Sequence, residues 1–133
     1  MEKLENFGEY AGYLRQLQKE AKSEKIFSSD FHLFGNVERY LQLCVQIIID
    51  IVHLTIIDLG LKRPADNYEA ISVLCEKKII SAVLASKLVK MVGLRNILVH
   101  EYGKIDRKKI YKILKENVKD LEMFKKQIVG HIK

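Results

Sequence analysis

The chain has little of what β-rich and disulfide-stabilised folds require. It holds one proline and seven glycines among 133 residues, which is too few turn residues for a β-sandwich or barrel, and no alternating run predicts a strand. Its two cysteines, Cys44 and Cys75, have neither a CxxC partner nor a histidine at metal-ligand spacing. We therefore expect reduced thiols and no metal site. The N-terminus lacks a basic start followed by an apolar run, so we expect no signal peptide and a cytoplasmic protein.

The composition predicts one folded domain over residues 1–133. Hydrophobic residues make up 48% of the chain and charged residues 30%, as in ordinary globular proteins. The most apolar stretch, residues 41–61, is interrupted by Gln46, Asp50, His53 and Asp58. These polar residues favour a buried helix over a membrane span.

Apolar residues at spacings of three and four predict an all-α, up-and-down bundle of four long helices and one short helix. Capping residues suggest where the helices begin: Ser28, Ser29 or Asp30 for the second helix, Asp66 or Asn67 for the third, and Asp106 for the fifth. Gly60 suggests where the second helix ends. The expected ranges are about 3–24, from the cap at 28–30 to 59, 66–77 (the short helix), 81–100, and 106–128.

The net charge of +6 belongs entirely to the last 30 residues, because residues 1–103 hold equal numbers of acidic and basic side chains. One side of the last helix is predicted to be apolar. The opposite side carries a lysine stripe, defined as Lys108, Lys112, Lys115, Lys119 and Lys126. This stripe is either a solvated face or an electrostatic surface for RNA or an acidic partner.

The second helix is apolar nearly all round but carries one polar stripe, which contains Arg39, Gln42, Gln46, Asp50 and His53. Buried polar groups need partners, so the stripe indicates a cleft, a polar network or a dimer-facing edge. Asp50 and His53 lack a third ligand at a convincing spacing, which argues against a metal site.

The most informative segment closes the fourth helix and reads Arg95-Asn96-Ile97-Leu98-Val99-His100-Glu101-Tyr102. An R-x4-H-x-Y pattern late in a helical bundle resembles HEPN domains, and specifically the HepT-like toxins of HEPN–MNT toxin–antitoxin pairs. The resemblance covers nearly the whole chain, including the Gly60-to-Pro64 loop and residues 88–96.

The resemblance implies a metal-independent endoribonuclease that acts as a homodimer on RNA, with no membrane partner and no cofactor of its own. His100 would move a proton, Arg95 would stabilise charge on the scissile phosphate, and Asn96 would orient it. The resemblance also implies that an MNT-type nucleotidyltransferase antitoxin uses ATP to transfer AMP to Tyr102, which silences the toxin.

Helix geometry adds a constraint of its own. Arg95 and His100 are five residues apart, about 140° around an ideal helix. A site that uses both needs an unwound helix end or a second copy of the chain. Two other interpretations stay open: a non-catalytic HEPN module that binds nucleotide or RNA beside a nucleotidyltransferase, and a helical dimerisation protein whose motif is structural.

Overall fold

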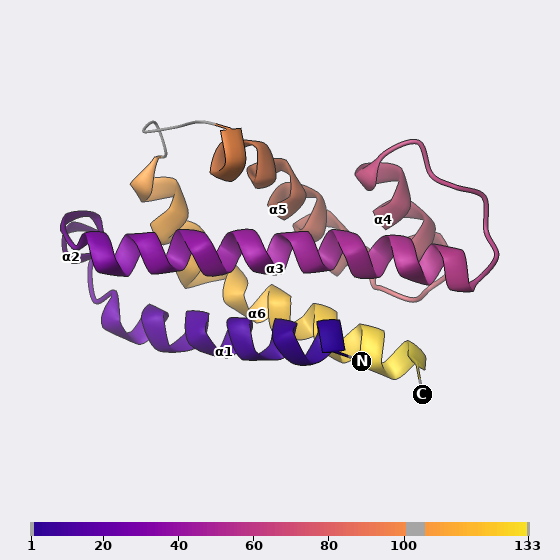
Figure 1. Cartoon of the computed structure of the whole chain (residues 1–133), viewed down its shortest axis with the longest axis horizontal. Coiled ribbons are helices and arrows are strands. Elements are labelled where there is room, and N and C mark those ends of the chain that lie inside the picture. Colours follow the sequence, from indigo (N-terminus) through magenta and orange to yellow (C-terminus); the bar gives the residue numbers. More distant parts are fainter. Residues whose placement is uncertain (1, 101–105, 133) are drawn as a thin grey trace.

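The computed structural model describes residues 2–100 and 106–132, with the side chains of residues 95–100 outside the description. The described residues form six helices and no strand, and they confirm the all-α prediction. The helices are α1 (Glu2–Glu20), α2 (Glu24–Ser29), α3 (Phe31–Asp58), α4 (Asn67–Glu76), α5 (Ala82–His100) and α6 (Arg107–Ile132). The four long helices run alternately up and down (Figure 1).

The short helix α2 differs from the sequence prediction, which extends the first helix to about residue 24. Helix α1 ends at Glu20 instead, and Ser23 begins a new helix by accepting a hydrogen bond from the Ile26 N–H at 3.1 Å. Helix α2 then buries Phe27 completely. The hydroxyl cap and this buried aromatic side chain explain why the chain turns here.

The predicted caps account for the other boundaries. Asp30 accepts from the backbone N–H groups of His32 and Leu33, and Asp66 accepts from that of Glu69. Gly60 follows α3 with φ of 67°, a left-handed conformation that glycine adopts without strain. The last helix continues to Ile132, four residues beyond the predicted end at 128.

Helix α3 lies at the centre of the bundle and contacts all five other helices. Its length and composition would allow it to cross a membrane, but half of its most apolar window is buried inside the protein. Leu41, Cys44, Ile48 and Val52 belong to that buried face. In this structure α3 is therefore the core helix of the bundle, as its pattern predicts.

The amphipathic pattern of α6 is also confirmed. All seven predicted apolar positions are buried, namely Ile110, Ile113, Leu114, Val118, Leu121, Phe124 and Ile128. Phe124 meets Phe7 of α1 edge to face, with ring centroids 5.6 Å apart. This packing fixes α6 against α1, and polar side chains of α6 flank the contact, some beside α1 and others beside α5.

Candidate active site

The last two turns of α5 carry Arg95, Asn96 and His100. Because α5 remains α-helical through His100, the Cα positions of Arg95 and His100 keep the angular separation of an ideal helix, about 140°. An unwound helix end before His100 is therefore not how the two residues would meet. Their side chains lie outside the described residues, as does Tyr102 entirely.

The end of the bundle that carries the motif also holds α2 and the first turns of α3 and α6 (Figure 1). Asp106 caps α6 by accepting from the N–H groups of Lys108 and Lys109, at 3.0 and 3.3 Å. Arg107 places its guanidinium 3.8 Å from the centre of the Phe34 ring and donates to the Ser28 carbonyl at 3.0 Å. These contacts join α6 to α2 and α3 beside the motif.

The first turn of α6 contains basic residues and no acidic one. Cations at a helix N-terminus oppose the helix dipole, so this arrangement costs stability. Two turns into α3, burial raises the pKa of the Glu38 carboxyl, and the Arg107 charge opposes the shift. The basic first turn of α6 thus makes this end of the bundle electropositive, and the half-buried Glu38 carboxyl lies at its edge.

A groove of about 570 Å³ runs between α5 and α6, and its described lining includes Leu94, the residue before the motif. Four lysines line it, two from each helix: Lys87 and Lys90 from α5, and Lys109 and Lys112 from α6. We call this set the lysine groove. Sequence reasoning singled out only Lys112. The available signal was the i, i+3 spacing of Lys87 and Lys90, which puts both on one side of α5.

The predicted lysine stripe of α6 divides into two environments. Lys108, Lys112, Lys119 and Lys126 are exposed, whereas Lys115 is partly buried. Lys115 Nζ donates to the Gln18 carbonyl oxygen at 2.7 Å, and Gln18 in turn donates to the carbonyls of Leu114 and Lys115. Lys115 therefore helps to join α6 to α1.

The polar stripe of α3 separates into distinct pairs. Asp50 accepts from Gln46 at 3.0 Å and from Lys3 of α1 at 3.2 Å. His53 instead pairs with Asn67 of α4 at 2.8 Å. Arg39 is exposed on the half of α3 nearer the motif end. Nowhere in the described residues do three or more His, Cys, Asp or Glu side chains gather as metal ligands would.

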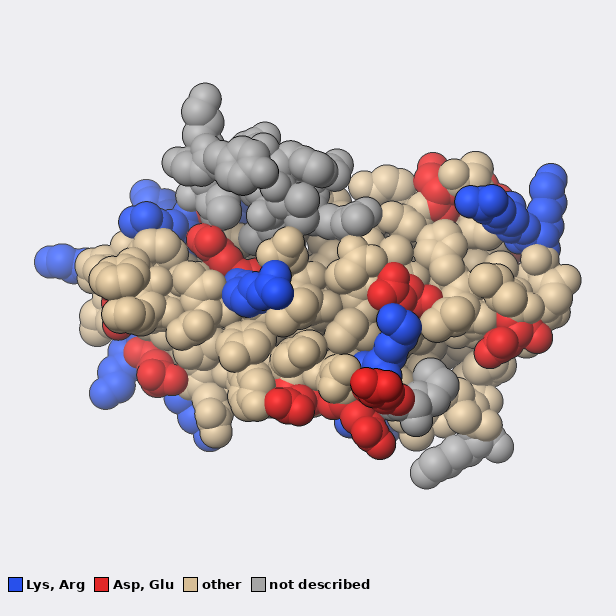
Figure 2. Space-filling view, in the orientation of Figure 1, with Lys and Arg blue, Asp and Glu red and all other residues tan. Residues whose placement is uncertain are grey.

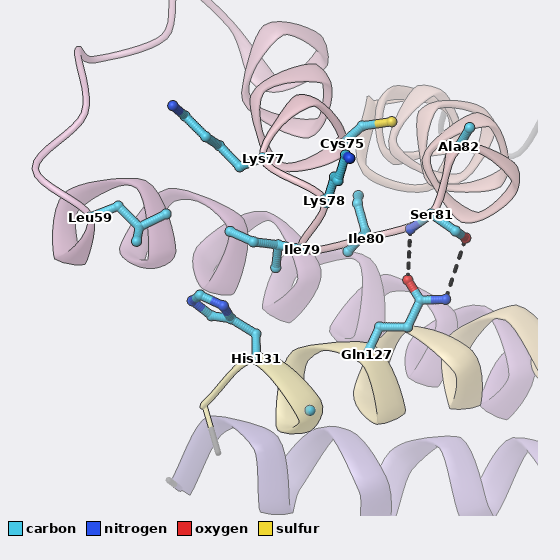
Figure 3. Close-up of a pocket in the computed structure, with 11 residues that line it drawn as sticks. Leu59, Cys75, Lys77, Lys78, Ile79, Ile80, Ser81, Ala82, Gln127 and His131 are labelled. Carbon is cyan, nitrogen blue, oxygen red and sulfur yellow. Dashed lines mark hydrogen bonds between the residues drawn. The ribbon is translucent and has the colours of Figure 1, made fainter.

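A second pocket, about 760 Å³, lies at the opposite end of the bundle, where the α4–α5 connection meets the end of α6 (Figure 3). Lys77, Lys78 and His131 line it. On one side it is closed by Ser81 and Gln127, whose reciprocal hydrogen bonds measure 2.8 and 3.3 Å. This pocket and the R-x4-H motif are thus separate features.

Fold and motif together define a HEPN-type helical bundle. A family model described as ribonuclease HepT-like matches residues 7–128, and the chain belongs to that family.

Similar proteins agree with this assignment. The mRNA nuclease HepT of Shewanella oneidensis is 29% identical over 111 residues, which is 84% of each chain. The tRNA nuclease HepT of Aphanizomenon flos-aquae is 28% identical over 98% of this chain and 87% of its own. A solved structure of a tri-AMPylated Shewanella oneidensis HEPN toxin in complex with MNT antitoxin has a TM-score of 0.85, with 26% identity over 97% of this chain and 95% of that one.

Proposed function

We propose that the chain is a cytoplasmic, metal-independent endoribonuclease toxin whose activity resides in the R-x4-H motif of α5. The observation that carries this proposal is the family match, which spans residues 7–128 and therefore includes Arg95, Asn96 and His100. The two similar nucleases act on mRNA and tRNA, as their names say. The electropositive end of the bundle gives an RNA backbone a favourable approach to the motif.

The proposed reaction is attack by an RNA 2′-hydroxyl on the adjacent phosphorus. The new P–O2′ bond forms as the P–O5′ bond breaks, leaving a 2′,3′-cyclic phosphate and a 5′-hydroxyl. The 2′-hydroxyl loses a proton and the leaving 5′-oxygen gains one. His100 moves one of these protons, because imidazole titrates near neutral pH. Arg95 offsets the charge on phosphorus, and Asn96 donates a hydrogen bond that orients it.

The proposal is tested by RNA cleavage and growth inhibition with wild type, Arg95→Ala and His100→Ala. His32→Ala is the matched control, because His32 is an exposed histidine outside the motif. We expect the motif variants to lose about 10²- to 10⁴-fold in cleavage rate and the control to keep it. Equal cleavage by all four proteins would contradict a catalytic role and favour a binding or dimerisation module.

We also propose that the active unit is a homodimer in which each site combines Arg95 of one copy with His100 of the other. The angular separation of these residues on a continuous α5 supports this arrangement. The exposed side of α3 provides a surface next to the motif. Acidic residues are concentrated along the α1 edge of that face, and its middle carries few charges (Figure 2).

Mixing the two inactive variants tests the shared site. If Arg95→Ala and His100→Ala subunits exchange freely, half the dimers are mixed and one of their two sites is intact, so about a quarter of wild-type activity returns. No recovery in a mixture shown by mass spectrometry to contain mixed dimers would contradict the shared site.

We propose, finally, that an MNT-type antitoxin silences the chain by modifying Tyr102. The Tyr102 hydroxyl would attack the α-phosphorus of ATP and release pyrophosphate, which adds AMP to the phenol. The tri-AMPylated state of the similar Shewanella toxin supports this. Mass spectrometry after co-expression with the antitoxin should find AMP on Tyr102, and an unmodified tyrosine in a neutralised complex would contradict the proposal.

A further inference from the structure

The lysine groove places four ammonium groups around one concavity. Lys90 and Lys112 are exposed on opposite walls, and Lys87 and Lys109 extend the same lining. Like charges gathered in this way repel one another, and they repel most strongly where helices exclude solvent between them. A fold that keeps such a cluster with few acidic side chains to offset it is suited to bind an anionic ligand.

Few acidic side chains among the described residues offset the positive charge of the groove lysines. The ion pairs found among the described residues join Lys3 to Asp50 and Arg15 to Glu122, and neither involves a groove lysine. One carboxylate, Glu116, does line the groove. It lies about two turns into α6, and since α5 and α6 run in opposite directions (Figure 1), it marks the end away from the motif. The positive charge is therefore concentrated toward Arg95.

The floor of the groove is apolar and consists of Met91, Leu94 and Ile113, each less than one tenth exposed. Among the described residues that line the groove there is no aromatic ring on which a base would stack. Lysine ammonium groups contact phosphates as point charges and do not distinguish bases. The groove therefore fits a sugar–phosphate backbone rather than a recognised base sequence.

We propose that the lysine groove binds the phosphodiester backbone of an RNA strand and leads that strand to the R-x4-H motif. This rests on the proposed ribonuclease function and adds its substrate-binding surface. Lys90 precedes Arg95 by five residues, about 7.5 Å along the helix axis and about 140° around it, so a strand that leaves the groove reaches Arg95 by bending around the end of α5. A recessed groove suits a strand, whereas an acidic protein surface is better matched by the exposed lysines of α6 outside the groove, namely Lys108, Lys119 and Lys126.

The test measures the binding of a fluorescent single-stranded RNA to full-length His100→Ala protein by anisotropy at several salt concentrations. The groove variant adds Lys90→Gln and Lys112→Gln, one from each wall. The matched control adds Lys62→Gln and Lys77→Gln, two exposed lysines away from the motif, in the α3–α4 connection and at the end of α4. Both variants remove two charges, and thermal melting verifies that both remain folded.

We expect the groove variant to bind RNA about tenfold more weakly and its log–log salt slope to fall by about 1.4, since each lost phosphate contact removes about 0.7 for single strands. The control should change affinity less than about threefold and keep the slope. A fall in RNA affinity that is equal in both variants, or absent from both, would overturn the proposal that the groove binds RNA. So would a groove variant that keeps RNA affinity but loses binding to the MNT-type antitoxin, because the surface would then be a protein interface.

Cleavage assays separate this proposal from the proposed function. With His100 restored, the groove variant should cleave with a raised KM and a nearly unchanged kcat, because binding and chemistry involve different residues. If the nuclease proposal fails, wild type does not cleave RNA. The comparison of RNA affinities still tests whether the groove binds RNA. If only the groove proposal fails, the variant cleaves like wild type at every RNA concentration.

Discussion

Lysines lie on both flanks of α6, but they make different contacts on each flank. On the flank toward α1, Lys115 donates to the Gln18 carbonyl, and Glu122 pairs with Arg15 at 2.6 and 3.0 Å. On the flank toward α5, Lys109 and Lys112 line a groove with two lysines of the facing helix. The neighbouring helix, rather than the lysine itself, decides whether a lysine forms a contact within the bundle or lines an open groove.

The largest expected effect comes from the buried face that supports both flanks. Phe124 is fully buried against Phe7, so Phe124→Ala should lower the free energy of unfolding by about 3–5 kcal/mol. Urea denaturation measures the loss. Lys112→Gln is the surface control and should stay within about 0.5 kcal/mol of wild type. A mild effect of Phe124→Ala would show that α6 does not depend on this contact with α1.

Exchanging lysine for methionine on each flank sharpens the contrast, because methionine keeps an apolar stem and removes the charge. Lys115→Met removes the partner of the Gln18 carbonyl and should cost about 1 kcal/mol of stability with RNA affinity nearly unchanged. Lys112→Met should instead weaken RNA binding and leave the free energy of unfolding nearly unchanged. The same urea and anisotropy measurements serve both variants, and a Lys115→Met protein that loses only RNA affinity would erase the distinction between the flanks.

The thiol of Cys44 reports how firmly the bundle is closed. Burial raises the pKa of Cys44 to about 12, so at pH 8 almost none of it is thiolate and its modification requires opening of the fold. Lys115→Met should speed labelling of Cys44 about fivefold, while Lys112→Met leaves the rate unchanged. Mass spectrometry distinguishes Cys44 from the partly exposed Cys75. Rapid labelling of Cys44 in wild type would contradict the closed core.

The smallest effect belongs to the ion pair on the α1 flank. Arg15 and Glu122 are each more than a third exposed, so solvent screens their attraction. Arg15→Ala should cost about 0.5 kcal/mol, and the cost should shrink in high salt. A loss above about 2 kcal/mol that persists in 1 M salt would show that the pair is a principal support of this flank.

Sequence patterns predict those parts of the fold that depend on one helix at a time. The seven apolar positions of α6 and the caps Asp30, Asp66 and Asp106 are local signals, and the structure contains them all. Helix α2 was missed because six residues are too short for periodicity to show. The hydrogen bond of Lys115 could not be predicted either, because its partner, Gln18, lies 97 residues away in sequence.

The candidate site is predictable only in part for the same reason. The R-x4-H motif lies within one helix and is visible as a sequence pattern. The lysine groove needs two helices that meet only in the folded bundle, and its α5 lysines belong to a helix with little amphipathic character. Net charge drew attention to α6 alone, although half of the groove lysines come from α5.

The proposed function requires that Arg95 and His100 cleave RNA by attack of the RNA's own 2′-hydroxyl. The most direct measurement is end-group analysis of RNA incubated in EDTA with wild type and with His100→Ala. Wild type should leave 2′,3′-cyclic phosphate and 5′-hydroxyl ends, and the variant should leave the RNA essentially uncut. Cleavage that stops in EDTA and returns with Mg²⁺, or identical products from both proteins, would contradict the proposed function.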